Sequence, residues 1–117
     1  MGDFGDWRKG NIMQVSFNAA VSGIKTAITR EDVSANNVAN INTRGFSQTD
    51  ALQTDMSPAG VRISGLRRTL NTRSQDSNTD LAKEMVNQVV NKNDLTANVK
   101  VIQTQDKMMG ALLDIIA

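Results

Sequence analysis

The sequence predicts a mainly α-helical protein, with long N- and C-terminal helices paired as an α-helical hairpin or coiled coil around a short β-hairpin or irregular insert. Apolar residues recur at three- and four-residue steps in both outer parts of the chain. The middle is rich in Ser, Thr, Asp and Gln and holds the one proline. Aromatic residues are 3% of the chain, so burial depends on aliphatic residues and six Met, which pack well between helices.

Composition also excludes several kinds of function. The chain contains neither Cys nor His, which removes disulfides, thiolate metal sites and the commonest acid–base group. We therefore expect no enzymatic activity, no metal and no cofactor. A formal net charge of +1 gives no long-range attraction to nucleic acid. No apolar run approaches the roughly 18 residues that a membrane span requires, so no direct membrane span is expected.

Residues 1–12 show the weakest pattern in the chain. They contain one Trp, two Gly-Asp pairs and no clear periodicity, which predicts a flexible lead or a segment added to the natural chain. Met13 is then a plausible natural start. The segment also lacks the apolar stretch of a secretory signal, so a cleaved signal is not expected.

Residues 13–45 are predicted to form the N-terminal helix and its closing turn. Apolar side chains return to one face through roughly four heptads. Gly45 can adopt the left-handed conformation that closes helices, so the helix should end close to it. The residues expected to pack between helices or subunits on this face are Phe17, Val21, Ile24, Ile28, Val38 and Ile41.

Residues 46–77 form the predicted insert. Val61 and Ile63 alternate with polar neighbours before Gly65, a period typical of a short strand. Two strands alone are barely stable, so the insert should lean on the helices or on a neighbour. Its basic patch is expected to be a solvated surface, or alternatively to meet an acidic neighbouring subunit, and consists of Arg62, Arg67, Arg68 and Arg73.

Residues 78–117 are predicted to form the long C-terminal helix, which makes one helical domain with residues 13–45. Ser77 or Asn78 is the expected N-cap, and Asp80 and Glu84 place negative charge near the positive end of the helix dipole. At 1.5 Å per residue the helix would be about 57 Å long, which suits a fibre or bundle better than a small globule. Its apolar seam is Leu81, Met85, Leu95, Val99, Ile102, Met109, Leu113 and Ile116.

Three polar residues, Gln88, Lys92 and Asp106, interrupt this seam. The simpler interpretation is that they mark solvent-exposed turns. The alternative is that they fix register or partner choice, as polar seam residues do in some coiled coils. The pair Met108-Met109 is interpreted as packing filler and not as a cofactor site.

Residues 34–46, SANNVANINTRGF, closely resemble the N-terminal motif of the flagellar axial proteins, a family of rod, hook and hook-associated subunits. Blocks within residues 78–116 resemble the C-terminal helix of the same family. The chain departs from the family at Arg44, where many members have Pro, and at residues 91–95, where many have Gln-Arg and an aromatic. The motif positions carried over are Asn36, Asn37, Asn40, Asn42, Thr43, Gly45, Phe46, Ala97 and Asn98.

The resemblance implies a structural subunit of the bacterial flagellar basal body rod that assembles by inter-subunit helix packing into a helical tube. The small insert is similar to that of proximal rod proteins. The implied partners are copies of this chain, other rod and hook–basal body proteins, and the flagellar type III export apparatus that delivers the subunit to the periplasm. From the residues alone, the asparagine cluster is interpreted as a solvated, fraying helix end. With the resemblance, the asparagine amides are expected to hydrogen-bond between helix and loop or between subunits. The alternative function is a cytoplasmic two-helix coiled-coil adaptor or regulator.

Overall fold

The computed structural model describes residues 3–72 and 76–116 of the chain, with side chains from Ile12 onward. Its elements confirm the predicted fold class of two long helices joined by an insert that forms a small antiparallel hairpin. In order they are helix α1 (Asp3–Ala39), strand β1 (Thr49–Asp55), strand β2 (Val61–Arg68) and helix α2 (Leu81–Ile116).

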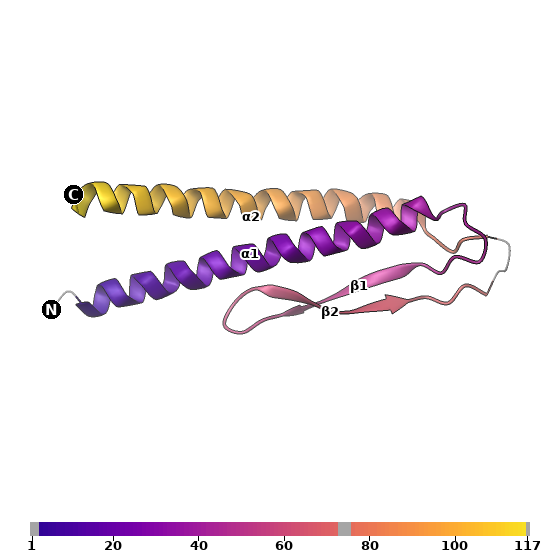
Figure 1. Ribbon diagram of the computed structural model, residues 1–117, viewed down its shortest axis with the longest axis horizontal. Helices are drawn as coiled ribbons and strands as arrows, with labels where there is room; N and C mark the ends of the chain where they lie inside the picture. The colour runs from indigo at the N-terminus through magenta and orange to yellow at the C-terminus, as the bar shows by residue number, and fades with distance from the viewer. Residues whose placement is uncertain (1–2, 73–75, 117) are drawn as a thin grey trace.

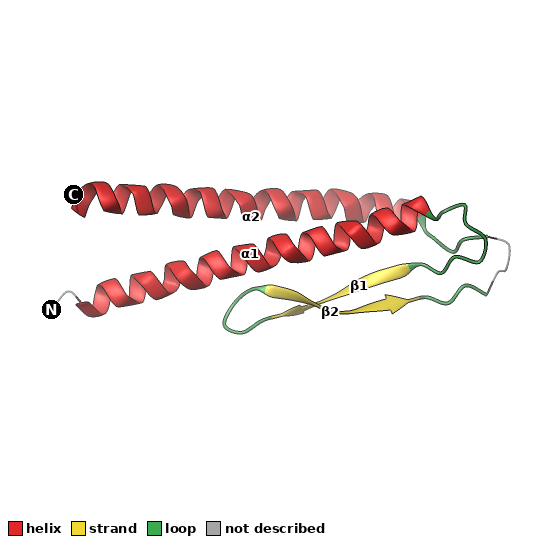
Figure 2. Ribbon diagram, in the orientation of Figure 1, coloured by secondary structure: helices red, strands yellow, loops and turns green. Residues whose placement is uncertain are grey.

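The molecule is long and flat, with principal extents of 70 × 23 × 15 Å. Helix α1 lies in the middle, with α2 along one side and the hairpin along the other (Figure 1). The two helices are joined by hydrogen bonds where α1 ends and α2 begins, and they separate towards the chain termini (Figure 1). Apart from the hairpin tip, the loops gather at the end where the helices meet (Figure 2).

Helix α1 begins at Asp3 and ends at Ala39, so it starts earlier than the periodicity predicted and includes most of residues 1–12. Extending an existing helix costs far less than nucleating one, so a segment without an apolar stripe or a proline can continue a helix formed downstream. At the other end, turns follow Ala39 as far as Gly45, which has a φ of 69°. The left-handed residue therefore closes the turn that follows the helix.

The hairpin pairs Thr49 with Arg68 at its open end and Asp55 with Val61 near its tip, with an irregularity in register between Leu52 and Gln53. Side chains of α1 hold it at the tip. The Val61 amide donates to Ser22 Oγ at 3.1 Å, and Thr26 Oγ1 donates to the Val61 carbonyl at 3.4 Å.

Gly60 makes this close approach possible. Its φ is 112°, and a β-carbon there would lie 2.6 Å from Ser22 Oγ. Any side chain at this position would therefore strain the backbone and collide with α1.

Helix α2 is capped by Asp80, because the Lys83 amide donates to Asp80 Oδ1 at 3.2 Å. The prediction of Ser77 or Asn78 as the N-cap was wrong. Asn78 instead joins the loops: its Oδ1 accepts from the Gln48 amide at 2.6 Å and its Nδ2 donates to the Thr69 carbonyl at 2.9 Å. Asn78 therefore makes tertiary hydrogen bonds between the loops, although its local sequence position favours the N-cap.

Candidate assembly surface

Asn37 is the centre of the contact between α1, the hairpin and α2. Its side chain is completely buried. Asn37 Nδ2 donates to the Thr49 carbonyl at 2.7 Å, and Asn37 Oδ1 accepts from the Thr49 amide at 3.0 Å. The side-chain amide therefore pairs with the backbone of β1 as another strand would.

The same Asn37 Nδ2 also donates to Glu84 Oε1 on α2 at 3.1 Å. Glu84 is 1% exposed, and its backbone carbonyl accepts from Ser34 Oγ at 3.3 Å. A buried carboxylate is costly without hydrogen bonds, so this contact holds the start of α2 at one height along α1.

Polar pairs continue along the helix contact. Arg30 Nη2 forms an ion pair with Asp94 Oδ2, and Asn91 Nδ2 donates to Glu31 Oε2 at 3.2 Å. Asn91 is itself buried. The residues of α2 turned towards α1 are thus mainly polar over this stretch.

Small residues complete the contact on α1. Ala20 and Ala27 are the buried hydrophobic residues within the described part of the chain. A β-carbon on Gly23 would lie 2.5 Å from Asn98 Nδ2. The helices therefore approach closely at Gly23, and Asn98 stands where an apolar side chain would be expected in a coiled coil.

The apolar residues of the predicted seam are left at or near the surface. Val21, Ile24, Val38, Ile41, Leu95 and Ile102 are half-buried. The exposed members are Phe17, Ile28, Leu81, Met85, Val99, Met109, Leu113 and Ile116. Soluble proteins that act as single chains usually bury hydrophobic residues and expose polar ones. This helix pair has the opposite arrangement.

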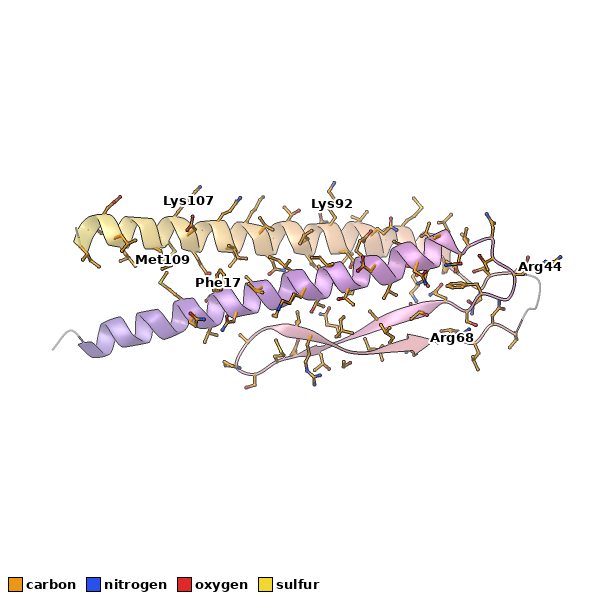
Figure 3. All side chains as sticks on the ribbon, viewed as in Figure 1. Phe17, Arg44, Arg68, Lys92, Lys107 and Met109 are labelled. Atoms are coloured by element: carbon orange, nitrogen blue, oxygen red, sulfur yellow. The ribbon has the colours of Figure 1, made fainter. Side chains whose placement is uncertain are left out.

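The C-terminal part of α2 shows this most clearly. Met109 points towards α1, whereas Lys92 and Lys107 point away from it (Figure 3). Met109 is nevertheless 53% exposed and Leu113 is 64% exposed, because the helices have already separated at this height. The apolar side chains in the last turns of α2 are therefore not buried within the single chain.

A shallow groove runs between the helices on one side of their contact. Ala27 and Ile28 line it from α1, and Val89 and Leu95 line it from α2. The polar seam residues Gln88 and Lys92 also border it, while Asp106 is exposed further along α2. Apolar grooves of this kind between two helices can receive a ridge of side chains from a third helix.

A second apolar stripe on α2 was missed by the sequence reasoning. Its residues are separated by four, eleven, seven and seven positions, which are sums of the three- and four-residue steps that identified the first seam, and all are exposed. They were missed because one seam already accounted for the period of the helix. The second stripe consists of Val86, Val90, Val101, Met108 and Ile115.

The remaining family-motif residues lie mainly around the end of α1. Asn40 Nδ2 donates to the Asn36 carbonyl at 2.8 Å, and Thr43 Oγ1 donates to Asn40 Oδ1 at 3.1 Å. The Phe46 carbonyl accepts from the Asn78 amide at 3.3 Å. Asn42 and Gly45 are exposed in the turn, and Ala97 is exposed on α2.

Asp50 joins the hairpin to α2. Lys83 Nζ lies 2.9 Å from Asp50 Oδ1, and Arg67 Nη2 lies 3.8 Å from Asp50 Oδ2. Burial raises the pKa of this carboxyl, but hydrogen bonds from Lys83 and Gln48 and the charges of Lys83 and Arg67 outweigh it and lower the pKa below its ordinary value. Arg62 and Arg68 are exposed, and Arg73 lies outside the described residues.

Within the described residues, no three His, Cys, Asp or Glu side chains lie together as a metal site would require. No described helix is long and apolar enough to cross a membrane.

Two models of known protein families match the chain. Residues 72–115 match the family model described as "Flagellar basal body rod FlgEFG protein C-terminal". Residues 17–46 match the model described as "Flagella basal body rod protein". Together the matches cover more than half of the chain, in the order in which its two helical parts occur. No curated protein matches the chain.

Proposed function

Since the chain belongs to the flagellar basal body rod protein family, we propose that it builds the rod by packing its helices against those of neighbouring subunits. The matched families are structural components of the flagellum, and their members act in the basal body. In this proposal residues 13–45 and 78–117 form one assembly domain, and the insert of residues 46–77 supports it from the side.

The observation that carries the proposal is that the helix pair buries polar residues and exposes apolar ones. Polar residues such as Asn37, Glu84 and Asn91 are buried between the helices, whereas Met85, Met109 and Leu113 are exposed. Covering a large aliphatic side chain contributes about 1.5–3 kcal/mol. The exposed seam therefore provides a driving force for association that folding of the single chain leaves unused.

Repetition of such contacts between identical or related subunits gives a helical tube when the contact does not close on itself. We propose that the neighbours are copies of this chain and other rod and hook–basal body proteins. Delivery through the flagellar type III export apparatus to the periplasm is part of the same proposal. Asn37 and its partners would then define the subunit conformation once the chain has folded at its destination.

Removal of residues 112–116 tests the proposal in a flagellated strain that lacks its own copy of this protein. These residues are exposed, so the shortened chain should stay soluble and helical. It should fail to incorporate into purified basal bodies and fail to restore motility. Lys107→Gln, a change at an exposed polar residue of the same helix, is the matched control and should incorporate normally.

Two results would contradict the proposal. One is incorporation of the shortened chain at the level of the full chain. The other is a sharp, concentration-independent dimer of the full chain in light scattering, which would favour the two-helix adaptor instead. A rod subunit should be monomeric, or should form larger assemblies as its concentration rises.

A further inference from the structure

Helix α2 carries apolar side chains on two flanks. The first flank has Leu81, Met85 and Val99, and the second has residues of the second stripe such as Val90 and Val101. At 100° per residue the two sets lie on roughly opposite sides of the helix. The cavities agree with this placement, because Leu95 lines the groove on one side of the α1–α2 contact and Val90 lines a separate cavity that also contacts the hairpin.

One partner helix cannot cover both flanks. A packed helix covers a stripe of about 100° on its neighbour, and α1 already occupies the polar face between the flanks through Glu84, Asn91 and Asn98. The molecule is only 15 Å thick in its thinnest direction, so the flat faces on both sides of α2 are open. Two separate neighbours are therefore needed to cover α2.

The two sides also differ in charge. Glu31 and Asp32 border the groove against Lys92, and Asp106 is exposed on the same flank, so carboxylates are in excess there.

On the second side, Arg67 and Lys83 line the cavity and share the carboxylate of Asp50. Exposed Lys100 borders the second stripe. Of the other acids on this side, Asp94 is paired with Arg30 and Glu84 is buried against Asn37. Basic groups are thus in excess on the second side, which makes it complementary to the first.

We propose that the second stripe of one copy docks on the groove and first flank of the next copy, so that each α2 lies between two neighbours in a head-to-tail series. This inference rests on the proposed function and names its contact surfaces. The second stripe extends from Val86 to Ile115, and the predicted seam that includes the first flank extends from Leu81 to Ile116. The partner must therefore present a helix of similar length, and a second α2 does so. Joining unlike flanks brings opposite charges together, whereas joining like flanks opposes equal charges. The contact is therefore heterologous and can repeat without closing.

The absence of cysteine from the chain permits a direct test. Single-cysteine variants are made at first-flank positions (Leu81, Met85, Val99) and at second-stripe positions (Val86, Val101, Met108), with Lys107→Cys as the outer-face control. Full-length proteins with tags of different mass are mixed in pairs at concentrations that give assemblies, and then treated with a short bis-maleimide. Mixed first–second pairs should give several-fold more cross-linked dimer than either variant alone or than pairs with Lys107→Cys.

Predominant first–first or second–second cross-links, or equal yields in all pairs, would overturn the proposal. Incorporation into basal bodies distinguishes its failure from failure of the proposed function. Val101→Glu with Met108→Glu should abolish incorporation, as should Met85→Glu with Val99→Glu. If only the first-flank variants are excluded, the rod function stands and the second contact is wrong. If both are incorporated normally, helix packing as the mode of assembly is wrong as well.

Discussion

The two halves of the helix pair are built from different chemistry. Where α1 ends and α2 begins, the helices are joined by buried polar contacts around Asn37, Glu84 and Asn91. Towards the chain termini the two helices diverge (Figure 1), and Met109 and Leu113 of α2 remain exposed. Hydrogen bonds, which are directional, thus hold together the half of the helix pair that packs within the single chain. Apolar surface, which is non-directional, lies in the half that remains exposed.

This difference separates folding from assembly. Buried hydrogen bonds contribute little net free energy, but they define a geometry because a misplaced partner is left unsatisfied. Apolar surface contributes more free energy and specifies geometry less. A subunit that joins its own helices mainly through polar groups keeps its apolar residues for its neighbours.

Asn37→Leu should have the largest effect on stability. It lies in the joined half of the helix pair, where α1 ends and α2 begins. It removes the pairing with both backbone groups of Thr49 and leaves Glu84 without its side-chain donor. Each buried group left without a partner costs about 1–3 kcal/mol, so the free energy of unfolding should fall by about 3–5 kcal/mol. Urea denaturation followed by circular dichroism measures this. Asn42→Leu, at an exposed turn position, is the control, and an equal loss there would refute the special role of Asn37.

Substitutions at two glycines allow the two halves of the helix pair to be compared directly. Gly23 lies against Asn98, whereas nothing lies within 4 Å of a β-carbon at Gly110. Gly23→Leu should lower the free energy of unfolding by about 1–3 kcal/mol, because it forces the helices apart. Gly110→Leu should leave it unchanged or raise it by up to about 1 kcal/mol, since leucine favours the helix more than glycine does. An unchanged or raised free energy of unfolding for Gly23→Leu would show that the helices do not pack closely at Gly23.

The sequence predicted the elements better than the contacts between them. Periodicity identified both helices, and the alternation at Val61 and Ile63 identified the hairpin. Periodicity alone could not show which stripe faces α1, because α2 carries two apolar stripes and a polar one that share its heptad spacing. A partner inside the chain and a partner outside it produce the same apolar pattern, so burial between α1 and α2 could not be read from hydrophobicity.

Asn37 illustrates a different limit. The motif singled it out with its neighbours Asn36 and Asn40, yet only Asn37 is completely buried. Its role depends on the backbone of Thr49, which the chain brings beside it through a turn. No local preference of asparagine contains that information.

Hydrogen exchange should show the boundary between the halves along α2 itself. Amides of residues 84–98 lie beside buried polar contacts, whereas the side chains of residues 106–116 are all exposed. Residues 106–116 should therefore open without unfolding the rest, and should exchange at least about tenfold faster, equivalent to about 1.4 kcal/mol. Assembly should abolish the difference. Uniform protection along α2 in the isolated chain would mean that the open half is already stabilised within the subunit.

The smallest expected effect is at Asp50, which joins the hairpin to α2 at the edge of the joined half. Its pKa is lowered in the folded protein, so its contribution to stability is present above the ordinary aspartate pKa of about 3.9 and is lost as the pH falls through the lowered value. Asp50→Asn should lower the free energy of unfolding at neutral pH by up to about 1 kcal/mol, the range of partly exposed ion pairs. The difference between the two proteins should stay constant from pH 7 to about pH 5 and shrink below about pH 4, where the wild-type carboxylate also becomes neutral. Denaturation curves across this range measure it, and a difference that grows on acidification would contradict the role of Lys83 and Arg67 as partners of this carboxylate.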